Sequence, residues 1–573
     1  MCQLRTLPFS LGLCLGLFAC GSTNPSGVDS NPASGGLANA GAGASTTSSG
    51  GSASGGGLGI RNDLGGGTSD GSSLGGGAGK GGSAGATDGA SVAANAGPSC
   101  PEKSLAAWLP ISSSNAPTPR TSEWVIPTDD GMLVWGGLGL NSMGAATAPY
   151  FDNGAIYHLC DDSWTPMSAA GAPPSLSAEI THPVPPGTWT GSGLIVWGGI
   201  ASPAIVSGYP EGTAPLAASL YHARSDSWTE MNRSGEPTAR DEEARVWTGK
   251  ELLIWGGVAQ SGDRSWANHQ DGALFDPATN RWRPMSTEGA PEGRALALGN
   301  EYVWTGTQLI VWGGLRLDTG SGFDPVYVPL NSGGIYDLAS NTWSSIAAQG
   351  APTHASGEVF WTGTKLLVLG LLDGRTTPGV LEFDGALFDP ASNSWSRMSP
   401  PDASLASDFV WSDGARQTFW AGSSLVMIGE RVSASGAPRA SDVALVYSSA
   451  TDRWRGANLP FSHNAMQIAA LVDGKIVLGG SGPSVTDGAG ADHSTTRLTV
   501  FDPNTLAFSE LPLLRDRSTP SVVSSAHHLL VWGGRDVYTD LNAPNPCQNA
   551  VGICDPITPT LTKLLGDGLA LGL

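Results

Sequence analysis

Basic residues are scarce in this chain. Its 573 residues include 29 Lys and Arg against 50 Asp and Glu, which gives a formal net charge of −21. Nucleic acids and anionic lipid headgroups are bound by clustered basic side chains. The composition therefore argues against a nucleic-acid partner and against adhesion to lipid through basic patches. We expect instead a solvated acidic surface that keeps the protein soluble.

Long apolar runs are also missing, apart from one short run at the N-terminus. Residues 7–19 are apolar, follow the single positive charge of Arg5, and are too few to cross a membrane permanently. The run ends in Leu17-Phe18-Ala19-Cys20, which resembles the lipobox of bacterial lipoproteins. The resemblance implies that residues 1–19 are a signal peptide and that Cys20 carries lipid; an ordinary signal peptide is the alternative.

Residues 20–99 contain very few aromatic or charged side chains and consist mostly of Gly, Ala, Ser, Thr and Asn. Such a stretch cannot bury enough apolar area to offset the entropy of ordering its backbone. We expect a disordered tether. Together with Cys20 it predicts a lipid-anchored protein of the bacterial cell envelope, and Gly21, which is not the Asp that favours inner-membrane retention, points to the outer membrane.

Cysteine is rare, with seven in the chain. Removal of the signal would leave Cys100, Cys160, Cys547 and Cys554 besides the lipidated cysteine, an even number in an oxidising compartment. Cys547 and Cys554 could close a small ring in the C-terminal tail, and Cys100 could then pair with Cys160. No CxxC pair or Cys/His spacing suited to zinc occurs, so we predict disulfides and no metal site.

An internal repeat begins after residue 100. Eight apolar segments end at or near Gly-Gly: 132–137, 194–199, 252–257, 309–314, 366–371, 425–430, 475–480 and 529–534. After each of the first seven, two aromatic residues follow seven positions apart: Tyr157/Trp164, Tyr221/Trp228, Phe275/Trp282, Tyr336/Trp343, Phe388/Trp395, Tyr447/Trp454 and Phe501/Phe508. Turn sequences such as Asp-Pro-Ala-Thr-Asn lie between the two rings, so each pair predicts a strand, a short turn and another strand.

These marks resemble kelch repeats, and the resemblance covers roughly residues 102–540. It implies an all-β, kelch-type β-propeller of four-stranded blades. We predict eight blades, with seven as the alternative if the last unit packs irregularly. No aromatic pair follows the eighth Gly-Gly, and the unpaired Trp108-Leu-Pro-Ile resembles an outer strand. We therefore expect an N-terminal strand to complete the last blade, a propeller over residues 100–545 and a tail over 546–573.

Strand alternation places the loops after Gly-Gly and those that connect blades on one face of the propeller. These loops are long, and ligand-binding residues concentrate on long loops held by a rigid scaffold. Candidates for a ligand are His182, Tyr209, Arg240, Glu243, Trp266, Arg294, His354 and Glu358. For each of them the alternative is local packing or pairing with neighbouring acids.

Several functions are compatible with a kelch-like propeller. A copper radical oxidase would need two His and two Tyr on copper and a Tyr–Cys cross-link, and no such set is present. A mutarotase or epimerase acting on carbohydrate, with an Arg, Glu or His near the propeller axis, is the enzyme alternative. We favour a monomeric, non-catalytic binding or scaffolding protein with a protein or glycan ligand and no cofactor.

Overall fold

The structure is a computed structural model that describes residues 108–572, with gaps. The gaps are residues 122, 138, 140–150, 174–186, 199–216, 261–264, 297–300, 319–325, 354–356, 372–382, 407–408, 411–416, 432–442, 461–465, 487–491, 494, 516–519, 526–527 and 540–559. All described residues belong to one compact unit, Ser73–Leu573. The predicted signal peptide, the tether and Cys20 lie outside the described residues.

The described residues form strands and one short helix, α1 (Ala403–Ala406), which confirms the all-β class. Each blade pairs four antiparallel strands in chain order. The first four blades are β2 (Trp124–Thr128), β3 (Gly131–Trp135), β4 (Gly154–His158), β5 (Ser163–Pro166); β6 (Thr188–Trp189), β7 (Gly193–Gly198), β8 (Ala217–His222), β9 (Ser227–Glu230); β10 (Ala244–Trp247), β11 (Leu252–Trp255), β14 (Gly272–Asp276), β15 (Arg281–Pro284); and β16 (Tyr302–Trp304), β17 (Gln308–Trp312), β20 (Gly333–Asp337), β21 (Thr342–Ser345).

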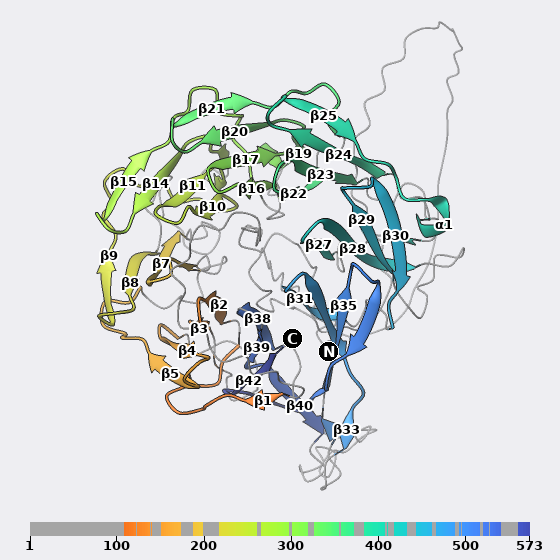
Figure 1. Cartoon of the computed structure of the whole chain (residues 1–573). Helices are drawn as coiled ribbons and strands as arrows, with labels where there is room; N and C mark the ends of the chain where they lie inside the picture. The colour runs from red at the N-terminus through yellow and green to blue at the C-terminus, as the bar shows by residue number, and fades with distance from the viewer. Residues whose placement is uncertain are drawn as a thin grey trace, which may run out of the picture. The chain divides into compact units, whose positions relative to one another are not determined.

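The remaining four blades follow the same order, except that the last takes its outer strand from the N-terminus. They are β22 (Gly357–Trp361), β23 (Leu366–Leu371), β24 (Phe383–Asp389), β25 (Ser394–Arg397); β27 (Gln417–Ala421), β28 (Ser424–Arg431), β29 (Val443–Ser448), β30 (Arg453–Asn458); β31 (Met466–Val472), β32 (Lys475–Ser481), β35 (Thr495–Asp502), β36 (Ala507–Glu510); and β38 (Ser521–Ser525), β39 (His528–Trp532), β42 (Gly568–Gly572), β1 (Leu109–Pro110). The blades are arranged around a common axis (Figure 1), so the predicted eight-bladed propeller is confirmed.

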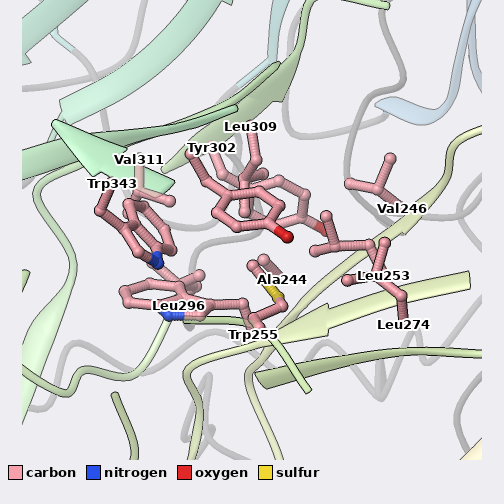
Figure 2. Packing of buried hydrophobic residues seen from close by; sticks show 12 residues of the cluster. Ala244, Val246, Leu253, Trp255, Leu274, Leu296, Tyr302, Leu309, Val311 and Trp343 are labelled. Atoms are coloured by element: carbon pink, nitrogen blue, oxygen red, sulfur yellow. The ribbon is translucent and has the colours of Figure 1, made fainter. Parts of the chain in front are cut away.

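The core is divided into eight seams, one between each pair of neighbouring blades. The second strand of every blade is apolar because it is buried on both faces. In β11, for example, Leu252 and Ile254 pack towards blade 2, whereas Leu253 and Trp255 pack towards blade 4. Figure 2 shows the seam between blades 3 and 4, where the rings of Trp255 and Trp343 lie 4.9 Å apart. The seam between blades 8 and 1 has the same construction and closes the ring.

The turn between the third and fourth strands of a blade also bonds to the preceding blade. In blades 1 to 6 its last residue is Asp or Asn in the left-handed region, with φ of 45–55°, a conformation that these two residues tolerate. Its side chain accepts a hydrogen bond of 2.6–3.0 Å from a backbone N–H of the preceding blade. The residues with this double role are Asp162, Asp226, Asn280, Asn341, Asn393 and Asp452.

The last blade closes as predicted, by the N-terminal strand. Leu109 of β1 pairs with Ala570 of β42. The indole N–H of Trp108 donates a 2.7 Å hydrogen bond to the carbonyl of Pro512 in the loop after blade 7. Outer-strand tryptophans of other blades make the same bond to the preceding blade.

The predicted tail over residues 546–573 is wrong, because its last part belongs to the propeller. β42 is the third strand of blade 8, and Leu571 lies opposite Leu529, where Tyr157 lies opposite Met132 in blade 1. An aliphatic residue in place of the aromatic one hid this strand from the repeat pattern. The propeller therefore extends to Gly572 rather than ending at residue 545.

Several short strands stand outside the four-stranded plan. Two hairpins follow the Gly-Gly pairs of blades 3 and 4, and a small sheet joins the corresponding loops of blades 7 and 8. These strands are β12 (Val258–Gln260), β13 (Trp266–Asn268), β18 (Leu315–Asp318), β19 (Val326–Pro329), β33 (Val485–Thr486), β34 (Asp492–His493), β40 (Arg535–Thr539) and β41 (Thr560–Leu564). β26 (Phe409–Val410) and β37 (Leu514–Arg515) add to the sheets of blades 6 and 7.

Candidate functional site

The candidate surface is the end of the propeller at which the second strand of each blade ends at or near Gly-Gly, with Gly-Leu in blade 5 and Gly-Glu in blade 6. We call it the Gly-Gly face. Both glycines of blade 3 have positive φ, 74° at Gly256 and 89° at Gly257. A Cβ on Gly257 would lie 2.7 Å from the carbonyl oxygen of Asp241, so only glycine allows this approach. The chain can therefore turn tightly into a loop at the root of each blade.

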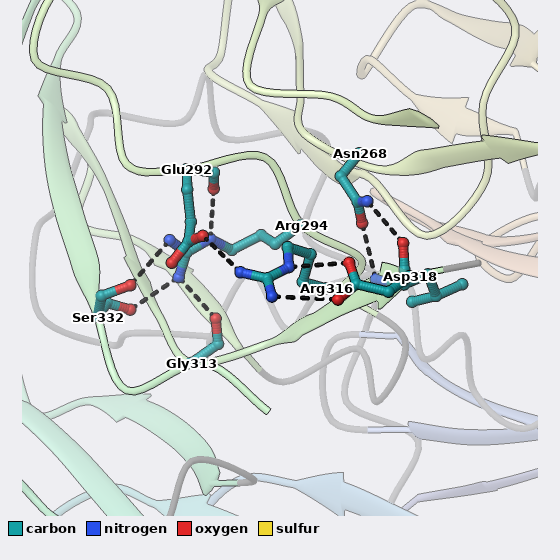
Figure 3. Close-up of polar contacts among 8 residues, drawn as sticks. Asn268, Glu292, Arg294, Gly313, Arg316, Asp318 and Ser332 are labelled. Carbon is teal, nitrogen blue, oxygen red and sulfur yellow. Dashed lines mark hydrogen bonds and ion pairs between the residues drawn. The ribbon is translucent and has the colours of Figure 1, made fainter. Parts of the chain in front are cut away.

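Three buried arginines hold these loop roots in place. Arg120, Arg240 and Arg294 are at most 1% exposed. The Nη1 of Arg294 donates to the carbonyls of Gly313 and Ser332, both at 2.7 Å, and its Nε donates to Glu292 (Figure 3). Arg120 and Arg240 bond to Gly136 and Gly256 in the same way. Each guanidinium thus ties the segment before a first strand to both ends of the loop.

Burial corrects the prediction that Arg240 and Arg294 face a ligand. Both side chains are fully buried and use their N–H groups on the protein itself. Desolvation lowers the pKa of Arg294 to about 10, and it does the same for Arg120. Asp271, which receives hydrogen bonds from His269 and Arg240, has a pKa well below its usual range. These arginines stabilise the loops instead of binding at their surface.

Above these roots, the hairpins of blades 3 and 4 form one platform. We call β12–β13 with β18–β19 the hairpin platform. The side chain of Asn268 donates to the carbonyl of Leu317 at 2.8 Å and accepts from its N–H at 2.9 Å, which joins the two hairpins. Trp266 and Tyr327 pack half-buried against Val258, Ala295 and Leu317. Trp266, a predicted ligand residue, is therefore a packing anchor of the platform.

The outer part of the platform is polar and exposed. Arg316 forms two hydrogen bonds to Asp318, at 3.0 and 3.1 Å, and reaches Glu292 at 3.4 Å (Figure 3). Val326 on β19 is 51% exposed. A rigid base with an exposed apolar and charged surface is suited to binding a macromolecule.

Carboxylates line the inner side of the same face, next to the first strands. The predicted ligand residue Glu243 pairs with Arg245. The predicted Glu358 is half-buried on β22. Sequence reasoning missed Glu242, which has a φ of 58°. Burial, and then repulsion from Asp241, Glu301 and Glu243, raises the pKa of Glu242 to about 8.

The other predicted positions lie outside the described residues. These are His182, Tyr209, His354, Cys100, Cys547 and Cys554. Cys160 is disulfide-bonded, and its pairing with Cys100 stays a prediction because every other cysteine is outside the described part. Within that part, no group of three or more His, Cys, Asp or Glu side chains is arranged to hold a metal ion, and no helix is long and apolar enough to cross a membrane.

Comparison with known families identifies the repeat. A model of the kelch-repeats domain described as KLHDC2/KLHL20/DRC7 matches residues 181–412, which hold blades 2 to 5. The chain is a kelch-type β-propeller. Because kelch propellers serve mainly as platforms for other molecules, this fold suggests a protein-binding or scaffolding role.

Solved structures similar to this kelch-type propeller are distant in sequence. The β-propeller domain of the trilobed protease from Pyrococcus furiosus is 9% identical, with a TM-score of 0.33, over 74% of this chain and 98% of that chain. Hydrazine synthase from Kuenenia stuttgartiensis is 15% identical, with a TM-score of 0.27, over 52% and 74% of the two chains. YjhT is 12% identical, with a TM-score of 0.29, over 54% and 97%. Similarity at this level supports no functional argument.

Proposed function

We propose that this kelch-type propeller is an extracytoplasmic binding or scaffolding protein whose protein or glycan ligand docks on the Gly-Gly face. The observation that carries the proposal is the hairpin platform. Two hairpins from different blades are joined by Asn268 and rest on loop roots that are fixed by Arg240 and Arg294. A preorganised surface loses little entropy when it binds.

We further propose that the protein is anchored to the outer membrane of a bacterial cell through lipid on Cys20. The lipobox-like sequence supports the anchor, and the disulfide at Cys160 is consistent with an oxidising compartment. A glycine-rich coil of the tether's length would span roughly 50 Å. The propeller could then reach a ligand at some distance from the membrane.

Replacement of the lipid-bearing cysteine tests the anchor. Cys20→Ser should move the protein from the membrane fraction to the soluble fraction of lysed cells, whereas Cys14→Ser, inside the signal peptide, should leave it membrane-bound. Retention of the Cys20→Ser protein in the membrane fraction would show that the anchor is not this lipid.

Site-specific photocrosslinking in cells tests the binding face. A photoreactive residue in place of Val326 should crosslink to an envelope component, because this position is exposed on the hairpin platform. The same residue in place of Ser344, which is exposed on the outer strand β21 of blade 4, is the matched control. Equal crosslinking at both positions, or none at Val326, would contradict a ligand on the Gly-Gly face.

Glu242 favours a second candidate, a carbohydrate-active enzyme of the mutarotase or epimerase kind. A carboxylic acid with a pKa of about 8 holds a proton at neutral pH and can act as a general acid. NMR measurement of anomer exchange in simple aldoses tests this function. Catalysis that is lost in Glu242→Gln and kept in Glu288→Gln, an exposed position, would support it; the absence of any turnover would leave binding as the function.

A further inference from the structure

Five consecutive blades place a tryptophan at the same position of their first strand. These residues are Trp189, Trp247, Trp304, Trp361 and Trp420, in blades 2 to 6. Each lies opposite the first leucine of the second strand, at the end remote from Gly-Gly, and a short turn follows it. First strands lie nearest the axis of the propeller (Figure 1). These five residues, which we call the tryptophan arc, therefore stand on the inner strands of five of the eight blades, at the same end of each strand.

The arc differs from the other repeated tryptophans in its contacts. Tryptophans of second and fourth strands meet across the seams, with ring centroids 4.7–5.7 Å apart. The arc indoles are half-buried: each packs one part of its ring against a seam, and among the described residues none of them is paired with another aromatic ring. The arc thus presents partly exposed rings, although the N–H group of Trp189 is itself buried.

Seam packing does not require tryptophan at this position. Blades 1, 7 and 8 place Pro127, Leu471 and Ser524 there and still form closed seams. A tryptophan carries a large apolar surface that is costly to leave in water. The tryptophans of blades 2 to 6 bury part of this surface in the seams, and the exposed remainder is available to a ligand.

The turns beside the arc carry few charges and several hydroxyl groups, and the exposed Asp129 of blade 1 lies next to Gly191 in the turn of blade 2. In a chain with 79 charged residues (29 basic and 50 acidic), the turns of blades 2 to 6 carry only Lys250, Glu251 and Lys365, and Glu251 is paired with Arg283. Exposed Ser and Thr occupy the tips, at Ser192, Thr307, Thr364 and Ser423.

The turns are also rigid and open to solvent. The Thr248 and Thr362 hydroxyls each close their own turn through a hydrogen bond to a carbonyl. A Cβ added to Gly249, Gly306 or Gly363 would meet nothing within 4 Å. The arc is therefore held in place by the turns, with free space around their tips.

We propose that the tryptophan arc binds a neutral polysaccharide. Pyranose rings stack their C–H faces on indoles, while their hydroxyl groups pair with N–H and hydroxyl groups of the site. Asp129 repels acidic glycans, and the few charges of the turns offer little to a charged peptide. The five rings belong to separate blades, so successive sugar units of one chain can each meet an indole. This surface is at the opposite end of the propeller from the hairpin platform and does not depend on a ligand there.

Binding of neutral oligosaccharides to the full-length protein in detergent tests the proposal. Cellohexaose, maltohexaose, xylohexaose and mannohexaose are titrated, with indole fluorescence and calorimetry as readouts. We expect at least one to bind, and Trp304→Leu, which copies Leu471, to weaken it by about 3–10-fold for the loss of one ring contact. The Trp304→Leu/Trp361→Leu double variant should weaken it further, whereas Trp304→Phe should retain most of the affinity.

The controls separate loss of the arc from loss of the fold. Trp164→Phe, on the outer strand of blade 1, copies Phe508 of blade 7; blade 1 has no arc tryptophan, so this variant should bind like the wild type. Thermal melting of each variant shows whether it is folded. The proposal is overturned if no oligosaccharide binds, if the double variant is folded and binds normally, or if a proline-rich peptide binds at the arc and the sugars do not.

Discussion

A tryptophan of this protein has a role that depends on the strand on which it lies. On second strands it is fully buried, as at Trp197, Trp255 and Trp312. On fourth strands it packs on the preceding blade and, except at Trp282, donates its N–H to a backbone carbonyl there, at 2.6–2.9 Å. On first strands it forms the arc. The same residue type thus packs in the seams at all three positions, and only on first strands does it leave part of the ring exposed around the axis.

The Asp or Asn that ends a turn has two roles at once. At Asp452 it adopts a φ of 51° and accepts hydrogen bonds from Tyr447 in its own blade and from Ser399 in the preceding one. Blade 7 has Leu506 at this position, with a φ of 61°, and Phe501 and Phe508 in place of the Tyr and Trp. The seam between blades 6 and 7 relies on apolar packing and on bonds from Arg455 to Asn504 and Pro503.

Glu242 should make the stability of the protein fall as the pH rises. Its folded pKa of about 8 lies above the ordinary value of 4.5, so between these values the folded state holds a proton that the unfolded state releases. The free energy of unfolding then decreases with pH across this window. We expect Glu242→Gln to remove part of this decrease, so that its melting temperature exceeds that of the wild type more at pH 8 than at pH 5.

Melting curves of both proteins between pH 4.5 and pH 8.5 check this prediction. Glu288→Gln, at an exposed position in the loop after blade 3, serves as the control and should follow the wild type at every pH. A constant difference between Glu242→Gln and the wild type would contradict a raised pKa at Glu242.

Sequence reasoning was correct for residues whose role depends on the strands of a single repeat. It was wrong for residues whose burial depends on tertiary contacts. The spacing of Tyr157 and Trp164 predicted a hairpin, and the two residues face each other across β4 and β5. Arg240 and Arg294 were assigned to a ligand face, although the shared Pro-x-x-Arg pattern with Arg120 could have indicated a repeated structural role. Burial of a charged side chain depends on tertiary contacts that no local pattern contains.

At the scale of elements, the arginine-anchored loop root explains how long loops are tolerated. The β18–β19 hairpin leaves and re-enters blade 4 at Gly313 and Ser332, and Arg294 bonds to both carbonyls. The strands of the blades could be predicted because they repeat. The added strands β12, β13, β18 and β19 could not be predicted from the repeat, because such hairpins follow the second strand only in blades 3 and 4 among the described residues.

Removal of the Arg294 guanidinium should destabilise the protein strongly. Arg294→Met leaves the carbonyls of Gly313, Ser332 and Glu292 buried without their donor, and we expect a loss of about 3 kcal/mol in the free energy of unfolding. Arg294→Lys should recover little, because one ammonium cannot reproduce the planar set of donors. Urea unfolding gives the values, and Arg316→Met, at an exposed guanidinium of the same hairpin, should have little effect. Wild-type stability in Arg294→Met would show that the loop root does not need this anchor.

At the scale of the whole molecule, both ends of the described chain meet in blade 8. The first strand of the chain, β1, pairs with the last, β42, and Ile111 is buried in the seam between blades 8 and 1. Closure therefore depends on residues more than 450 positions apart, since Leu109 pairs with Ala570. The sequence indicated the N-terminal half of this closure through Trp108, whereas the C-terminal half was missed because β42 carries none of the aromatic marks.

Deletion of β1, the strand that completes blade 8, should destabilise the closed propeller. We compare a protein that begins at residue 113 with one that begins at residue 100, both with Cys160→Ser so that they do not differ in a disulfide. The shorter protein lacks β1 and leaves an edge of β42 unpaired. It should melt at a lower temperature and associate through that edge, as measured by calorimetry and light scattering. The longer protein should remain monomeric, and identical melting of the two would mean that β1 is not what closes the propeller.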